Sequence, residues 1–216
     1  MNLRLHSNHI EGSKLTHDQT RYIFETKTLD VTGKAVKVDD IVETVNHFRC
    51  IDLIIEGAHT KLTENFIKQL HFILKSETTD SQKSWFRVGD YKQLENEVGG
   101  GRETTKPAEV AGAIKALLKK YNSKSKITFD DILDFLVRFE SIHPFQDGNG
   151  RVGRLIMFKE CLKHNIVPFI ITEELKMYSY RGINNWNDER GYLRNTCLTG
   201  QDAMKATLDY FGINYE

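Results

Sequence analysis

The chain has 216 residues, a length that suits one domain with a sizeable hydrophobic core. Its 30 basic and 30 acidic side chains give a formal net charge of zero, so it lacks the basic excess expected of a nucleic-acid-binding protein. No apolar run approaches the roughly 18 residues of a membrane span, and the first residues form no apolar signal region, so we expect a cytoplasmic protein without nucleic-acid or membrane partners. The three cysteines are far apart in apolar surroundings, which favours buried thiols of a reducing compartment over a disulfide framework or a metal site: Cys50, Cys161 and Cys197.

The first notable stretch is SNHIEG, residues 7–12. Its spacing places Ser7 and Glu11 on one face of a single helical turn, and Gly12 can end that turn. Taken alone, this pattern is typical of a capped turn at the surface.

A series of helices is predicted next. Residues 16–26 favour a short helix, and residues 30–37 read as a polar loop. A long helix begins at Asp39 or Asp40, and Thr63 caps another helix whose apolar residues follow helical spacing.

Helical periodicity disappears between residues 84 and 107. The pair Gly89-Asp90 and the three consecutive glycines at 99–101 indicate a mobile hairpin between two helices. The simpler alternative is a flexible surface loop.

Two more helices and a loop follow. Pro107 opens a helix at a position where its missing N–H costs little. Thr128 and Asp131 resemble a capping box at the start of a helix with one apolar stripe. Because Pro144 disfavours the helical conformation for the residue before it, residues 142–148 should form a loop.

The chain re-enters a helix near Asn149, which keeps its apolar residues on an inner side. The apolar run at 169–171 is too short to be assigned to a strand or a helix start. Residues 171–186 suggest a helix, and residues 201–211 form the last one. The predicted fold class is an all-α bundle with one small β-hairpin.

The most informative stretch is HPFQDGNGRVGR, residues 143–154, which joins a loop to the first turn of a helix. The unpaired N–H groups and the positive dipole end of such a turn favour an anion. Gly148 and Gly150 let the backbone approach phosphate oxygens closely. Arg151 and Arg154, three residues apart, can clamp further oxygens.

Two side chains of this loop suit chemistry on a bound phosphate. Asp147 is placed to hold a Mg²⁺ ion, which usually takes one or two carboxylates together with substrate oxygens. His143 carries an imidazole, the group suited to removing a proton near neutrality. The inferred chemistry is attack of a hydroxyl on a nucleotide phosphate, and the alternative is a solvated basic helix start after an ordinary turn.

The stretch resembles the motif HxFx(D/E)GNGRxxR of the Fic family, and every fixed position is matched. The resemblance implies transfer of AMP from ATP to a Ser, Thr or Tyr hydroxyl of a target protein. It implies that His143 is the general base, that Asp147 carries Mg²⁺ and that Phe145 is an apolar anchor seating the loop. Phosphate contacts are implied for Gly148, Asn149, Gly150, Arg151 and Arg154, the last of these on the γ-phosphate.

Beside this motif, residues 7–12 are similar to the inhibitory motif (S/T)xxxE(G/N) of the family, with Ser7 and Glu11 at its required positions. The resemblance implies an N-terminal inhibitory region at residues 1–30 and a catalytic core at residues 31–216. Glu11 would pair with Arg154 and compete with the γ-phosphate. One charge-assisted contact of about 1.5–3 kcal/mol corresponds to roughly 10- to 150-fold inhibition, so some activity should leak through.

The family also has a β-hairpin flap that holds the target peptide as an added strand, and its equivalent here is the stretch 84–107. Target contacts are therefore expected at Tyr91, Lys92, Gly99 and Gly100. Lys92 stands where the family usually has Arg in a G-x-Y-R pattern, which weakens the local match. The segment YRGI resembles the family element Y-x-x-L/I, so Tyr180 is expected to line the adenine pocket, with core packing as the alternative.

Two other functions stay open. Related proteins move phosphate or phosphocholine on the same scaffold, or remove AMP. A non-catalytic regulator would bind nucleotide or a partner and use Glu11 and Arg154 as a switch, although the intact His143 counts against it. Self-modification and a homo-oligomer are also open.

Overall fold

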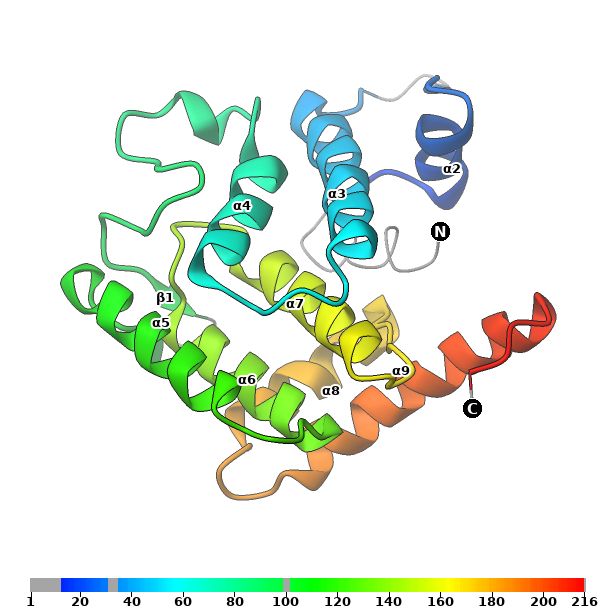
Figure 1. Ribbon diagram of the computed structural model, residues 1–216. Coiled ribbons are helices and arrows are strands. Elements are labelled where there is room, and N and C mark those ends of the chain that lie inside the picture. The colour runs from blue at the N-terminus through cyan, green and yellow to red at the C-terminus, as the bar shows by residue number, and fades with distance from the viewer. Residues whose placement is uncertain (1–12, 31–34, 99–101, 216) are drawn as a thin grey trace.

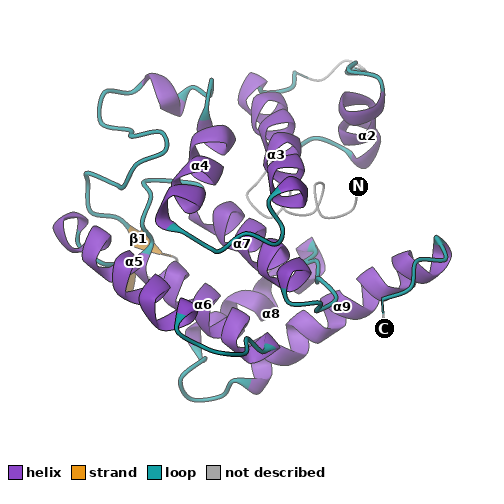
Figure 2. Ribbon diagram, in the orientation of Figure 1, coloured by secondary structure: helices purple, strands orange, loops and turns teal. Residues whose placement is uncertain are grey.

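The computed structural model describes residues 13–30, 35–98 and 102–215, and these residues form a helical bundle (Figures 1 and 2). The helices, in chain order, are α2 (His17–Glu25), α3 (Val38–Glu56), α4 (Glu64–Lys75), α5 (Pro107–Asn122), α6 (Phe129–Ile142), α7 (Asn149–Lys163), α8 (Glu173–Asn184) and α9 (Gly191–Tyr210). A short 3-10 turn spans Asp80–Gln82. The predicted all-α class is confirmed for the described residues.

Two strands of two residues each, β1 (Glu97–Val98) and β2 (Arg102–Glu103), pair antiparallel within the stretch 84–107. Glu97 lies opposite Glu103 in this register. The strands precede α5, and Figure 2 shows them beside the loop that follows α6.

Helix α7 runs through the middle of the bundle and packs against α3, α4 and α6 (Figure 1). Its residues Val152 and Leu155 join a core cluster with side chains of α3, α4 and α5. Its residues Met157 and Cys161 join a second cluster with side chains of α6 and α9. A helix with apolar residues on several sides is expected to be buried on several sides. The first turn of α7, which carries the motif, is therefore fixed by neighbours on more than one face.

The start and end of α6 follow from the sequence. The Thr128 hydroxyl accepts from the Asp131 N–H, and the Asp131 carboxylate accepts from the Thr128 N–H, so the predicted capping box is confirmed. At the other end His143 adopts a left-handed conformation with φ of 50° before Pro144. His is one of the residues enriched in that region, and the proline disfavours the helical conformation for His143.

The last helix starts earlier than predicted. We expected it to begin near residue 201, whereas α9 begins at Gly191. Residues 191–200 include two glycines and two threonines, which are poor helix formers. Leu193 and Cys197 nevertheless bury their side chains completely in the second core cluster. Tertiary packing therefore stabilises a helix in a segment whose own composition disfavours helix formation.

All three cysteines are free and buried, as predicted. Within residues 13–30, 35–98 and 102–215, no helix combines the length and the apolarity needed to cross a bilayer.

Candidate active site

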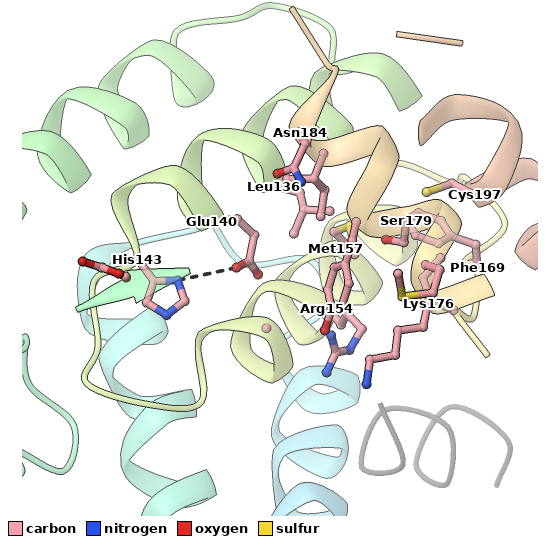
Figure 3. A pocket seen from close by; sticks show the side chains of 16 residues that line it. Leu136, Glu140, His143, Arg154, Met157, Phe169, Lys176, Ser179, Asn184 and Cys197 are labelled. Atoms are coloured by element: carbon pink, nitrogen blue, oxygen red, sulfur yellow. Dashed lines mark ion pairs between the residues drawn. The ribbon is translucent and has the colours of Figure 1, made fainter. Parts of the chain in front are cut away.

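A cavity of about 560 Å³ lies between α6, α7 and α8. Motif residues line one side of it, and α8 lines another (Figure 3): His143, Gly150 and Arg154 from the motif, and Lys176, Ser179 and Tyr180 from α8. Buried apolar side chains such as Met157, Phe169 and Ile171 complete the wall. The volume lies in the range typical of small-molecule sites, and the mixture of an apolar wall with a few convergent polar groups is typical as well.

His143 reaches this cavity because it closes α6. Its left-handed backbone turns the chain sharply at the helix end, and the imidazole stays beside the last turn of α6. There its Nδ1 lies 3.8 Å from Oε2 of Glu140, one turn earlier on the same helix (Figure 3).

The loop after His143 is anchored by Phe145, whose side chain is fully buried. Its ring stacks on His71 of α4, with ring centroids 3.9 Å apart and an angle of 1° between the planes. The Gly89 N–H donates to Nδ1 of His71 over 2.9 Å, so the ring proton is on Nε2, which lies 3.2 Å from the Asp147 carbonyl oxygen. Burial lowers the pKa of His71 to about 3, which keeps the ring neutral. The expectation that Phe145 seats the loop agrees with this packing.

The buried side chain of Asn149 holds the same loop by hydrogen bonds to the Phe145 backbone. Its Oδ1 accepts from the Phe145 N–H and its Nδ2 donates to the Phe145 carbonyl oxygen, each over 2.8 Å. The side chain is buried, so its amide serves the loop and does not face the cavity. Gly148, just before it, has φ of 81°, a conformation that side chains rarely adopt.

A buried lysine that the sequence did not single out holds the acidic residue of the motif. Nζ of Lys75, whose side chain is 2 % exposed, lies 2.7 Å from Oδ2 of Asp147 and 2.6 Å from Oε1 of Glu43. It also lies 3.2 Å from Oδ2 of Asp80. We call these four residues, with Arg151, the Lys75 cluster. Burial alone would raise the pKa of the Asp147 carboxyl, but the charges of Lys75 and Arg151 outweigh it and lower that pKa to about 2.

The two motif arginines diverge, contrary to our expectation that both would clamp phosphates. Arg154 lines the cavity. Arg151 is buried and points the other way, where it pairs with Glu43 of α3 and with Asp147. The guanidinium lies there because α3 supplies an acidic partner on that side of α7. Arg151 thus supports the loop from behind, and Arg154 is the motif arginine that faces the cavity.

The comparisons with known proteins agree with this geometry. Residues 61–161 match the Fic/DOC family. The matching segment runs from the start of α4 through most of α7, so it holds Lys75, the strands and the whole motif.

Solved structures show that the bundle has the Fic fold. A Fic-domain signalling protein of Bacteroides thetaiotaomicron superposes with a TM-score of 0.80 at 22 % identity, over 100 % of this chain and 88 % of that one. Fic-1 of C. elegans superposes with a TM-score of 0.78 at 19 % identity, over 97 % of this chain and 62 % of that one.

Curated relatives are similar over almost the whole chain. Protein adenylyltransferase Fic of Aedes aegypti is 26 % identical over 212 residues, and that of Drosophila melanogaster is 27 % identical over 212 residues. The alignments cover 95 % of this chain but only 40 % and 41 % of those proteins. The chain therefore spans about two fifths of the length of these relatives.

The stretch before α5 connects the two strands to the motif loop. The Lys92 N–H donates to the Pro144 carbonyl oxygen over 2.9 Å, and its buried Nζ donates to Asn96 and Thr104. Asn96 in turn donates to the Phe145 carbonyl oxygen over 3.1 Å. Burial lowers the pKa of Lys92 to about 8.

These contacts correct one expectation. We expect Lys92 to contact a target protein. In the structure its ammonium donates to Asn96 and Thr104 at the base of the hairpin and is buried away from the surface. Tyr91 is half-buried and packs on Phe145, with their ring centroids 6.1 Å apart. The other two predicted flap residues, Gly99 and Gly100, lie outside the described residues, as do the predicted inhibitory residues Ser7 and Glu11.

The predicted adenine contact, Tyr180, lines the cavity with its side chain partly exposed. Nζ of Lys176 lies 6.0 Å from the centre of its ring, at the limit of a cation–π contact. Tyr180 is thus part of the cavity wall and not part of the buried core.

The described residues contain no group of three or more His, Cys, Asp or Glu side chains that could hold a metal ion. A Mg²⁺ ion that binds nucleotide phosphates needs only one or two protein carboxylates. The Asp147 side chain is 48 % exposed and its low pKa keeps it ionised, so it fits this role through one carboxylate. Its Oδ2 already accepts from Lys75 and Arg151.

Proposed function

We propose that the protein is an adenylyltransferase that transfers AMP from ATP to a hydroxyl side chain of a target protein. The observation that carries the proposal is the cavity itself, because His143, Gly150 and Arg154 of the motif and Tyr180 of α8 all line it. The names of the curated relatives support the same activity.

In this proposal the triphosphate lies across the first turn of α7. The free N–H groups and the dipole of that turn attract it, and Gly150 leaves room for close approach. Arg154 holds the γ-phosphate by charge-assisted hydrogen bonds. The adenine lies against Tyr180 and the apolar wall formed by Met157 and Phe169.

The chemical step is an in-line displacement at the α-phosphorus. Nε2 of His143 takes the proton of the target hydroxyl while that oxygen bonds to the α-phosphorus. The bond between the α-phosphorus and the bridging oxygen to the β-phosphate breaks, and pyrophosphate leaves with the electron pair. The imidazolium then releases its proton to water. A Mg²⁺ ion held by Asp147, when bound, would neutralise charge on the phosphates and on the leaving group.

We also propose that the protein inhibits itself and that its target binds at the hairpin. Glu11 would pair with Arg154 and exclude the γ-phosphate, and Ser7 is the other required position of the inhibitory motif. A target segment would add to the strands by backbone pairing at β1 or β2. The likeness of residues 7–12 to the inhibitory motif supports the first idea, and the hairpin beside the motif loop supports the second.

Label transfer tests the activity. In a Glu11→Gly background, α-labelled ATP should label an acceptor protein or the chain itself, and His143→Ala should abolish labelling while it keeps ATP affinity measured by calorimetry. Labelling from γ-labelled ATP would indicate a phosphotransferase instead. Transfer that survives His143→Ala would overturn the assignment of the base. A Glu11→Gly protein that binds ATP and labels no hydroxyl acceptor would favour a nucleotide-binding regulator.

Arg154 provides a test of the inhibitory proposal. Glu11→Gly should raise the rate of transfer by roughly 10- to 150-fold, the ratio given by one charge-assisted contact. Adding Arg154→Ala should remove activity again, because the γ-phosphate loses the same guanidinium. An unchanged or slower rate in the Glu11→Gly variant would contradict self-inhibition.

A further inference from the structure

Glu140 is a carboxylate in the wall of the cavity that the proposed phosphate chemistry does not use. It lies on α6, one turn before His143, and its side chain is 15 % exposed. Its Oε2 lies 3.8 Å from Nδ1 of His143, and Figure 3 shows the two side chains facing each other at the end of α6. The Nδ1 atom is shielded from solvent.

The neighbouring helix leaves room for this carboxylate. Gly153 on α7 faces α6, and a Cβ placed there would lie 2.9 Å from Oε1 of Glu140 and 3.0 Å from Cδ1 of Leu136. Real Cβ atoms essentially never come that close to another heavy atom, so a side chain at this position would displace the carboxylate. The position of Glu140 therefore depends on α7 as well as on its own helix.

We propose that Glu140 is a positioning residue for His143. Its carboxylate faces Nδ1 and favours the tautomer with the proton on Nδ1, which leaves the lone pair of Nε2 for the hydroxyl proton. The same negative charge stabilises the imidazolium that forms when Nε2 takes that proton. The inference deepens the proposed function and depends on it.

The present separation suits such a role. A distance of 3.8 Å is longer than a hydrogen bond, and catalytic hydrogen bonds are often long before substrate binds and shorten in the loaded site. The contact also fixes the orientation of the neutral His143 imidazole toward the cavity.

If Glu140 contacted the nucleotide instead of His143, its replacement would have a different effect on ATP binding. A carboxylate in the wall of a nucleotide cavity can also contact the ligand directly or repel its phosphates. In that case its removal would change the affinity for ATP, whereas a positioning residue changes turnover at constant affinity.

Two variants in the Glu11→Gly background separate these roles. Glu140→Gln keeps the size of the side chain and removes its charge. Gly153→Ala leaves Glu140 in the sequence and displaces its carboxylate. The matched control is Gly112→Ala on α5, where an added Cβ meets nothing within 4 Å. We expect both test variants to lower kcat for AMP transfer at least about tenfold with ATP affinity within twofold, and the control to change neither.

A spectroscopic measurement tests the tautomer without turnover. The ¹⁵N shifts of the imidazole, recorded on nucleotide-free protein at a pH where the ring is neutral and assigned by comparison with His143→Ala, distinguish protonated Nδ1 from protonated Nε2. We expect protonated Nδ1 in the parent and in Gly112→Ala, and its loss in Glu140→Gln.

Three outcomes would overturn the inference: a kcat in Glu140→Gln within twofold of the parent, a loss of activity explained by weaker ATP binding, or an unchanged tautomer. If the parent transfers no AMP at all, the proposed function fails, and the nucleotide-free spectra still show whether Glu140 controls the ring.

Discussion

Replacing Lys75 by methionine should destabilise the fold strongly, because the lysine is buried among three carboxylates. Its Nζ lies within 3.2 Å of oxygens of Glu43, Asp80 and Asp147, and its side chain is 2 % exposed. Burial alone would lower the pKa of Lys75, but Asp147 and Glu43 outweigh that effect and raise it. Methionine keeps most of the length of the side chain and removes the charge, so the carboxylates would lose their shared partner.

The loss of unfolding free energy depends on how well water can solvate the three carboxylates once the ammonium is gone. Breaking a buried ion pair costs about 3–5 kcal/mol when the remaining charge is left without compensation. Here the carboxylates reach solvent in part, and Arg151 stays close to two of them, so we take the low end, about 3 kcal/mol. For a chain of this size each kcal/mol corresponds to a shift in Tm of about 2–4 °C, which gives a decrease of about 6–12 °C.

Urea unfolding and calorimetry measure this loss, and Lys68→Met is the matched control. Lys68 lies on the same helix and also pairs with two carboxylates, Glu64 at 3.3 Å and Asp90 at 2.9 Å, but more of its side chain reaches solvent. Its replacement should cost about 0–1 kcal/mol. If the two variants lost the same free energy of unfolding, burial of the Lys75 cluster would not be what makes it stabilising.

Glycine substitution, thiol labelling and acid titration test other parts of the structure. Gly112→Ala should stabilise the fold by about 0.5–1 kcal/mol in urea titrations. Gly200→Ala should destabilise it, since its Cβ would lie 2.6 Å from the Ile170 carbonyl oxygen; the reverse order would contradict the packing of α9. Native protein should resist alkylation and react only after unfolding, because burial raises the pKa of all three thiols: Cys50, Cys161 and Cys197. Asp147 has its pKa lowered from 3.8 to about 2, so its contribution to stability is complete above pH 3.8 and is lost as the pH falls toward 2. Asp147→Asn should therefore flatten the dependence of unfolding free energy on pH in that window, and equal slopes would contradict the pairing.

The sequence predicts best those elements whose signals are local. The capping box at Thr128 and Asp131 requires only two residues three apart, and the end of α6 requires only Pro144. Both predictions are confirmed. The start of α9 was missed because residues 191–200 become helical through burial of Leu193 and Cys197 against other helices, and that contact has no local signature.

The same distinction explains which site residues could be predicted. His143 and Arg154 stand in the motif, and their spacing alone indicates a site. Lys75 and Glu43 are 72 and 108 residues from the motif residues they contact, Asp147 and Arg151. A lysine at the end of an amphipathic helix ordinarily reads as a solvated residue. Only the packing of α3 and α4 against α7 reveals that this one is buried.

The motif residues fall into two groups in the structure, and we expect mutations in the two groups to reduce turnover for different reasons. Phe145, Asn149 and Arg151 bind other parts of the protein and hold the loop, whereas His143 and Arg154 face the cavity. A catalytic geometry must be held within about 0.5 Å to be productive, so loss of a loop contact should reduce turnover without any lost contact to the nucleotide. For this reason a strict motif of this kind cannot be interpreted residue by residue as a list of phosphate ligands. About half of its side chains act by fixing where the others lie.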